Sequence, residues 1–194
     1  MSRKTLQPLI DEVRQCTICK EHLPLGPRPI VSASTDSRIL IIGQAPGKKV
    51  HESGIPWDDK SGDNLRAWMG ISTLDFYDAE KVALMPMGFC YPGKGKSGDL
   101  PPRAECAPQW HDQLQAQLNR ISLTLLIGKY AHGYYLENLK TSLTETVRNF
   151  RAYQPRFFVL PHPSPRNNIW RAKNPWFDEE VLPALKLQVR KTLA

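Results

Sequence analysis

Short unbroken runs of apolar residues recur along the chain and alternate with amphipathic segments. The clearest run, Arg38 to Ile42, contains four branched aliphatic residues in a row, which is typical of a strand buried on both faces. The first amphipathic segment repeats apolar residues at helical spacing, at Leu6, Leu9, Ile10 and Val13. The runs predict strands over residues 38–42, 81–85, 123–128 and 156–160, and the amphipathic segments predict helices over 5–16, 63–69, 74–79, 103–120, 129–137, 142–148 and 176–193.

Strands that alternate with helices predict a three-layer α/β/α fold around a central, mostly parallel, four-stranded sheet. A chain of 194 residues fits a single domain spanning residues 1–194. Glycine, proline and polar residues dominate four other stretches, which are therefore expected to be irregular: residues 23–30, 51–62, 91–102 and 161–168.

The segment Gly43–Gly47 follows the first predicted strand, so it forms the loop at the carboxyl end of that strand. Ligands of open α/β sheets bind just beyond such ends, where small residues let a substrate approach the backbone. The glycine spacing matches neither of the two common phosphate loops, because Lys48 and Lys49 are not followed by the required hydroxyl residue. By itself, this loop is either a ligand site or a tight turn between a strand and a helix.

Positive charge is in excess, with 26 Lys and Arg residues against 19 Asp and Glu residues. A net charge of +7 favours a polyanionic partner such as DNA, although an ordinary basic surface has the same composition. Several basic residues lie in or beside the loops expected at one end of the sheet, where they would suit a DNA backbone: Lys48, Lys49, Lys94, Lys96, Arg103, Arg166 and Arg171.

No apolar run approaches the roughly 20 residues that span a bilayer, and the first residues lack the apolar core of a signal peptide. We therefore expect a cytoplasmic monomer with no membrane partner. In a reducing compartment, cysteines bind metal more often than they form disulfides. Cys16 and Cys19 are two residues apart, and Cys90 and Cys106 are separated by fifteen residues. Four such thiolates suit either an iron-sulfur cluster or structural zinc.

Three motifs together resemble the uracil-DNA glycosylase superfamily: Gly43-Gln-Ala-Pro-Gly47, Gly54-Ile-Pro-Trp57 and His162-Pro-Ser-Pro165. The cysteine spacing is similar to that of its iron-sulfur branches, families four and five. The motifs occur along the chain in the same order as in the family, and the resemblance spans residues 6–193. It implies a monofunctional glycosylase that removes uracil from DNA by hydrolysing the N-glycosidic bond, without strand cleavage, in base excision repair. It also implies a [4Fe-4S] cluster on Cys16, Cys19, Cys90 and Cys106, with zinc as the alternative.

The resemblance assigns roles to individual residues. A glycosylase must extrude a nucleotide, hold its base and stabilise the charge that develops as the bond breaks. His162 would stabilise that charge and Trp57 would stack on the base, although the sequence also allows a surface histidine and a tryptophan that only packs. Gly43, Ala45, Pro46 and Gly47 would border the base. The DNA contacts would come from Ser164, Arg166, Asn167 and Lys48.

Three positions depart from the family pattern. Gln44 and Ala45 stand where related enzymes carry acidic or Asn side chains that position or activate water. Glutamine cannot act as a general base, although its amide can orient a water or read a base edge. Asp58, or its neighbour Asp59, is the nearest carboxylate that could take over a catalytic role. Pro86 stands where these enzymes commonly read uracil with Asn, and it has no donor.

These departures leave two alternatives open. The first is a glycosylase for another deaminated base, such as hypoxanthine or xanthine. The second is a catalytically silent DNA-binding module of the same fold, which the His162 motif argues against. The preferred base and the preference for single-stranded or double-stranded DNA are not determined by the sequence.

Overall fold

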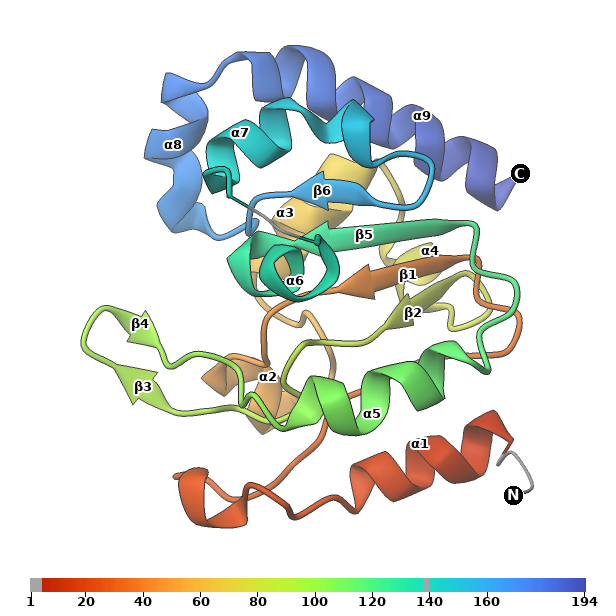
Figure 1. Cartoon of the computed structure of the whole chain (residues 1–194), viewed down its shortest axis with the longest axis vertical. Coiled ribbons are helices and arrows are strands. Elements are labelled where there is room, and N and C mark those ends of the chain that lie inside the picture. The colour runs from red at the N-terminus through yellow and green to blue at the C-terminus, as the bar shows by residue number, and fades with distance from the viewer. Residues whose placement is uncertain (1–4, 138–139) are drawn as a thin grey trace.

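A computed structural model describes residues 5–137 and 140–194. At its centre, four parallel strands form a sheet in the order β2-β1-β5-β6 (Figure 1). The strands are β1 (Ile39–Ile42), β2 (Val82–Leu84), β5 (Leu123–Ile127) and β6 (Phe158–Leu160). Each lies inside one of the four apolar runs, so the predicted strands and their parallel arrangement are confirmed.

Strand β1 lies inside the sheet and has a neighbour on each side. Ile41 pairs with Leu84 of β2 and with Leu125 of β5. All four residues of β1 are at most 2% exposed. A strand with no polar position is stable only where both faces of the sheet are covered, which explains why its sequence is continuously apolar rather than alternating.

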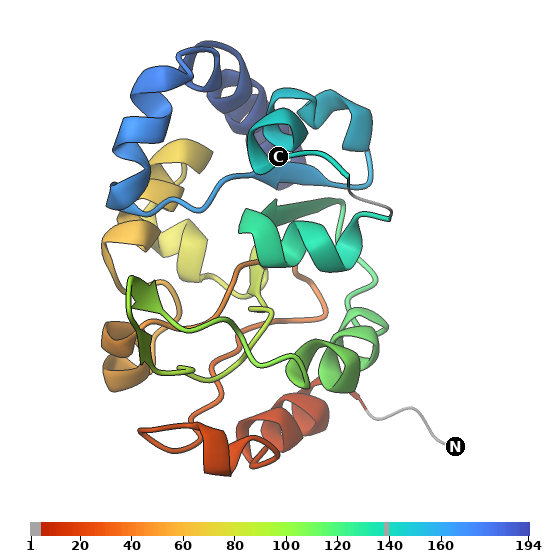
Figure 2. The same cartoon turned by 60° about the vertical axis from the view of Figure 1, so that its left-hand side comes forward.

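Helices cover both faces of the sheet, which confirms the predicted three-layer α/β/α fold (Figures 1 and 2). One layer contains α3 (Lys60–Met69), α4 (Thr73–Tyr77) and α9 (Leu182–Leu193), and the other contains α5 (Cys106–Gln115), α6 (Gly128–Tyr135) and α7 (Leu143–Arg148). Helix α1 (Leu6–Arg14) packs against α5. Among the described residues, no helix has both the length and the apolar character needed to cross a membrane.

Helix α2 was not predicted from the sequence, and helix α3 begins earlier than predicted. Helix α2 (Lys48–Ser53) ends at Gly54, which adopts a left-handed conformation with φ of 75°. Helix α3 begins at Lys60 rather than at residue 63, because the Asp59 side chain accepts a hydrogen bond from Gly62 N and caps the helix. Both helix ends are defined by a single residue inside a polar segment, where apolar periodicity has no signal.

The glycine-rich stretch 91–102 is also more regular than predicted. It contains a short antiparallel hairpin of β3 (Lys94–Gly95) and β4 (Gly98–Asp99), which extends from the carboxyl-end edge of the sheet (Figure 1). The stretch after β6 contains a 3₁₀ turn, Pro165–Asn167, and helix α8 (Asn168–Lys173). The remaining turns are 3₁₀ segments at Lys20–His22 and Phe150–Tyr153 and a π-helical segment, Phe177–Val181, directly before α9.

The connections after β1 and β5 run to opposite layers. The chain leaves β1 toward α2 and α3, whereas it leaves β5 directly into α6 on the other face (Figure 1). In parallel α/β sheets this divergence opens a crevice beyond the carboxyl ends of the two strands, where ligands bind. The loops after β1, β5 and β6 therefore meet at one edge.

Truncating the central strand should destabilise the whole fold. Ile41 is fully buried, and Ile41→Ala is expected to lower the free energy of unfolding by about 2–5 kcal/mol, because it leaves a cavity in the core. Leu74, which is 85% exposed, serves as the control, and Leu74→Ala should change stability by about 0.5 kcal/mol or less. Urea unfolding followed by circular dichroism measures both. Equal effects of the two substitutions would contradict the central position of β1.

Candidate active site

A pocket of about 460 Å³ lies at the carboxyl ends of the strands. It is built from separate segments that the fold brings together: the loop after β1, the turn before α3, the end of β2 and the loop after β6. Its lining includes all five residues predicted to border a base, together with several that were not: Ile30, Gly43, Gln44, Ala45, Pro46, Gly47, Val50, Pro56, Trp57, Asp59, Ser61, Leu84, Pro86 and His162.

Gln44 and His162 are brought together against Gly128, the first residue of α6. A Cβ atom at Gly128 would lie 2.9 Å from Gln44 Nε2 and 3.6 Å from His162 Cβ, and the φ of +81° also favours glycine there. Gly128 therefore lets the loops after β1 and β6 approach each other. The sequence reasoning did not assign it to the site, although a glycine directly after an apolar strand was the same signal that singled out Gly43.

Trp57 has a left-handed backbone with φ of 59°, which is rare for a bulky residue. Its indole lies over Gly43, where an added Cβ would come within 2.7 Å of Cζ2, and it stacks on the His162 ring with the centroids 5.9 Å apart. Its carbonyl oxygen lies where a Cβ of Gly62 would be, at 1.8 Å. Two glycines therefore make room for this conformation, and strained residues of this kind cluster at functional sites.

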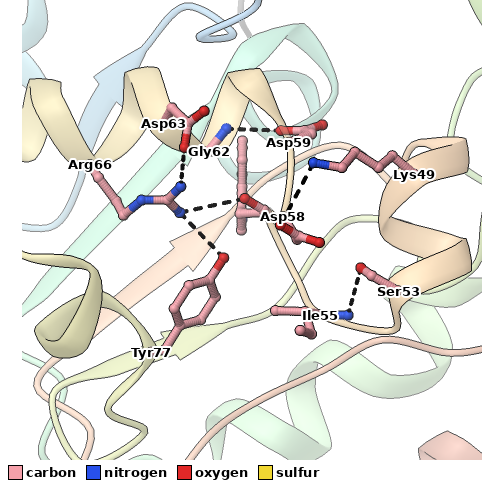
Figure 3. Close-up of polar contacts among 10 residues, drawn as sticks. Lys49, Ser53, Ile55, Asp58, Asp59, Gly62, Asp63, Arg66 and Tyr77 are labelled. Carbon is pink, nitrogen blue, oxygen red and sulfur yellow. Dashed lines mark hydrogen bonds and ion pairs between the residues drawn. The ribbon is translucent and has the colours of Figure 1, made fainter.

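Arg66 of α3 braces the turn that carries Trp57 (Figure 3). Its guanidinium donates to Asp63 Oδ1 at 2.5 Å and to the Tyr77 hydroxyl at 3.3 Å, and it makes a longer contact of 3.5 Å to Trp57 O. It also lies 5.2 Å from the centre of the Phe76 ring, and its side chain is only 12% exposed. The sequence reasoning missed Arg66, because nothing in a helical arginine indicates which backbone carbonyl it will contact.

The two adjacent aspartates of the turn point in different directions. Asp58 lies outside the pocket and forms a 3.8 Å ion pair with Lys49, as Figure 3 shows. Asp59 lines the pocket, and its Oδ1 accepts the 2.9 Å hydrogen bond from Gly62 N. The structure therefore places Asp59, rather than the predicted Asp58, beside the candidate catalytic residues.

His162 follows β6 on a loop that is tied down at two backbone carbonyls. Asn167 Nδ2 donates to His162 O at 2.6 Å, and Asn64 Nδ2 of α3 donates to Pro163 O at 2.8 Å. Burial lowers the pKa of His162, and the negative charge of Asp59 partly opposes this shift. The imidazole is therefore neutral at pH 7 and presents one donor and one acceptor.

Comparison with known proteins assigns this architecture to a family. Residues 31–186 match the model of the uracil DNA glycosylase superfamily, which is most of the chain. The chain belongs to this superfamily. It is also similar to a type-4 uracil-DNA glycosylase from Thermotoga maritima, with 25% identity over 171 residues that cover 84% of each chain. The membership predicted from the three motifs is thus confirmed.

The four residues predicted to contact DNA follow pocket residues in the chain, Lys48 after Gly47 and the other three after His162, and they have partners within the protein. Arg166 Nη1 donates to Ser97 O of the β3–β4 hairpin at 2.9 Å, and Arg166 N donates to Ser164 Oγ at 3.3 Å. Asn167 holds the His162 carbonyl, and Lys48 forms a 3.6 Å surface ion pair with Glu52. Arg166 therefore joins the hairpin to the His162 loop, and the sequence could not indicate this contact.

The four cysteines are free thiols that share a second pocket of about 310 Å³. Cys16 and Cys19 follow α1, Cys90 lies in the loop after β2, and Cys106 begins α5. Burial raises the pKa of Cys90 to about 11 and of Cys106 to about 12, so both thiols are protonated without a metal. Apolar side chains form the rest of the wall, with Arg103 as an additional basic group.

The spacing of these thiols bears on which metal would fit. A single zinc ion needs ligand sulfurs about 3.8 Å apart, given Zn–S bonds of about 2.3 Å in a tetrahedron. Within the described part of the chain, no three His, Cys, Asp or Glu side chains converge closely enough to hold one ion. The structure therefore shows four thiols lining one pocket but no metal-binding group among the described residues.

The packing of Trp57 on Gly43 can be tested by fluorescence. Gly43→Ala should move the indole away from His162, because the added methyl overlaps the ring, and should change tryptophan emission and acrylamide quenching. In a Trp57→Phe background the same substitution should have little effect on emission. Gly133→Ala is the control, since a Cβ at Gly133 meets no other atom within 4 Å. Equal responses in the two backgrounds would show that the clash does not involve Trp57.

Proposed function

We propose that this protein is a monofunctional DNA glycosylase that removes uracil from DNA by hydrolysing the N-glycosidic bond, at the start of base excision repair. The observation that carries the proposal is the meeting of Gln44, Trp57 and His162 in one pocket, at the strand edge where this fold binds ligands. Membership of the uracil DNA glycosylase superfamily and the similarity to a type-4 uracil-DNA glycosylase support the same reaction.

His162 is proposed to donate a hydrogen bond to the base oxygen that gains negative charge as the glycosidic bond breaks. A neutral imidazole is suited to this role, because its N–H donates while Asn167 holds the backbone carbonyl of His162 and Trp57 stacks on the ring. Stabilising charge where it develops is often the largest catalytic contribution, and losing one such donor costs about 3–4 kcal/mol of transition-state stabilisation. Trp57 is proposed to offer its ring face to the extruded base.

Asp59 and Gln44 are proposed to position the attacking water between them. Asp59 Oδ1 is held by the cap hydrogen bond to Gly62 N, which fixes the orientation of the carboxylate. The other oxygen faces the Gly47 side of the pocket, 3.9 Å from where a glycine Cβ would lie. A carboxylate at this place supplies the base that Gln44 cannot be, since an amide does not accept a proton at neutral pH.

The DNA backbone is proposed to cross the edge where the His162 loop and the β3–β4 hairpin meet. Lys94 and Lys96 are exposed on the hairpin, and Ser164 and Arg166 lie on the adjoining loop. Cationic side chains in such a place would neutralise phosphates, while the pocket receives the base. The hydrogen bond from Arg166 to Ser97 O would hold the His162 loop and the hairpin in a fixed position relative to each other.

A [4Fe-4S] cluster is proposed to be held by Cys16, Cys19, Cys90 and Cys106. When bound, it would join the end of α1 to the start of α5 and to the loop after β2, and so contribute folding free energy. Its chemistry here is structural. We further propose that the chain acts as one domain, as a cytoplasmic monomer.

The reaction can be tested with oligonucleotides that carry a single uracil, hypoxanthine or xanthine, followed by alkali to reveal abasic sites. Wild-type protein should excise uracil, and His162→Ala should slow excision by roughly 100- to 1000-fold. Asp59→Asn should slow it by roughly 100-fold, because the amide cannot accept a proton. The matched control Asp58→Asn, which only removes a surface ion pair, should stay within about twofold.

Other outcomes of this assay would assign other functions. Excision of hypoxanthine or xanthine in preference to uracil would redirect the proposal to that base. If no base is excised while binding to the oligonucleotides is retained, the protein is a DNA-binding module rather than a glycosylase. A larger loss for Asp58→Asn than for Asp59→Asn would reverse the assignment of the carboxylate.

The cluster can be tested by purification without oxygen. The protein should be brown, with visible absorbance that fades on oxidation and with iron and acid-labile sulfide in equal amounts. Cys106→Ser should lose the absorbance and lower the melting temperature, because α5 and α1 would then lack the shared ligand site. A colourless protein with stoichiometric zinc would contradict the proposal.

A further inference from the structure

A chain of hydrogen-bonded polar side chains, of which His111 is fully buried and Gln115 and Tyr135 are half-buried, leads to Pro86 in the pocket wall. Gln115 Nε2 approaches the Tyr135 hydroxyl at 2.9 Å, that hydroxyl lies 2.5 Å from His111 Nδ1, and His111 Nε2 lies 3.1 Å from Pro86 O. His111 and Gln115 come from α5, and Tyr135 ends α6. The chain thus connects two helices to a residue that lines the candidate base pocket.

Only one arrangement of protons satisfies every member of this chain. A proline carbonyl can only accept, so His111 Nε2 must carry the hydrogen. His111 Nδ1 must then accept, which requires the Tyr135 hydroxyl to donate to it and to accept in turn from the Gln115 amide. Burial lowers the pKa of His111 to about 4, which is consistent with the neutral ring that this arrangement needs.

The His111 ring has little freedom to move. It is fully buried, it stacks on Tyr135 with the centroids 5.9 Å apart and an angle of 25°, and Phe89 meets it edge-on at 5.7 Å. Leaving a nitrogen of this buried ring without a partner would destabilise the fold, so its two hydrogen bonds and its packing hold His111 in place.

The segment around Pro86 is hydrogen-bonded to β1 and its loop through the residues on either side of the proline. Met85 N donates to Ile41 O and Met87 N donates to Gly43 O, both at 3.0 Å, so this segment continues alongside β1 and its loop. Pro86 has no N–H, and its carbonyl is directed to His111 on the α5 side. The proline ring is left as part of the pocket wall.

We infer that His111 is a positioning residue for base recognition, which holds the Pro86 carbonyl away from the pocket and so fixes the proline ring as a rigid apolar wall. The inference rests on the proposed glycosylase function. It means that residue 86 selects the base by shape rather than by a side-chain hydrogen bond. A neutral histidine outside the pocket would thus determine how tightly the base is held.

Substitutions at His111, made in the full-length protein, separate this role from a purely structural one. His111→Leu removes the donor to Pro86 O, and it should raise KM for a uracil oligonucleotide by roughly 3- to 10-fold with little change in kcat. His111→Gln keeps an N–H that can reach the carbonyl, and its KM should be close to that of the wild type. Nitrogen NMR should show His111 of the wild type as the neutral Nε2–H tautomer from pH 5 to pH 8.

The control for lost stability is Thr146→Val. Thr146 is buried in α7, where its hydroxyl donates to Ser142 O at 2.9 Å, and it lies in no wall of the base pocket. This variant should lower the melting temperature without a change in KM. The inference is overturned if His111→Leu affects KM no more than Thr146→Val does, or if His111 is the Nδ1–H tautomer. Absence of excision by the wild type would instead overturn the proposed function, and the tautomer is measured without substrate.

Discussion

The complete burial of β1 is the constraint on which the rest of the structure depends. Four adjacent aliphatic residues with no polar position require neighbouring strands on both edges and helices on both faces. Covering both faces sends the connections after β1 and β5 to opposite layers. That divergence opens the crevice in which Gln44 meets Gly128, so the stability of the core and the position of the site have the same origin.

The pocket itself is shaped by close approaches that only small residues permit. Gly43 lies under the indole of Trp57, Gly62 accommodates the Trp57 carbonyl, and Gly128 admits Gln44 and His162. The left-handed backbone of Trp57 is unfavourable on its own, and contacts with Arg66 and His162 surround it. Because the Trp57 side chain is already ordered before a base binds, it would lose less conformational entropy on binding.

One stretch of chain serves both pockets. Pro86 lies in the wall of the base pocket, and Cys90, four residues later, lies among the cysteines. Helix α5 begins at Cys106 and carries His111, whose ring contacts the Pro86 carbonyl. The two pockets are thus connected through one stretch of chain and through the hydrogen bond from α5.

Much of this fold could be predicted from the sequence alone, because its strongest signals are local. The four strands are continuous apolar runs, and α1 shows helical periodicity in Leu6, Leu9 and Val13. The three motifs and the cysteine spacing indicated the family. Helix α2 was missed because a six-residue helix has too few apolar positions to show a period. The β3–β4 hairpin was missed because strands of two residues that include glycine show no alternation of apolar and polar side chains.

The tertiary structure alone decided which neighbouring groups face the pocket. Asp58 and Asp59 are chemically identical neighbours, and only the cap of α3 directs one of them inward. Arg66 and His111 contact backbone carbonyls that lie 9 and 25 positions away in the chain, and Arg166 contacts a hairpin 69 positions away. Local patterns and motifs determined the strands and the family, because these depend on near neighbours. Side-chain direction depends on packing between distant segments, which exists only once the chain has folded.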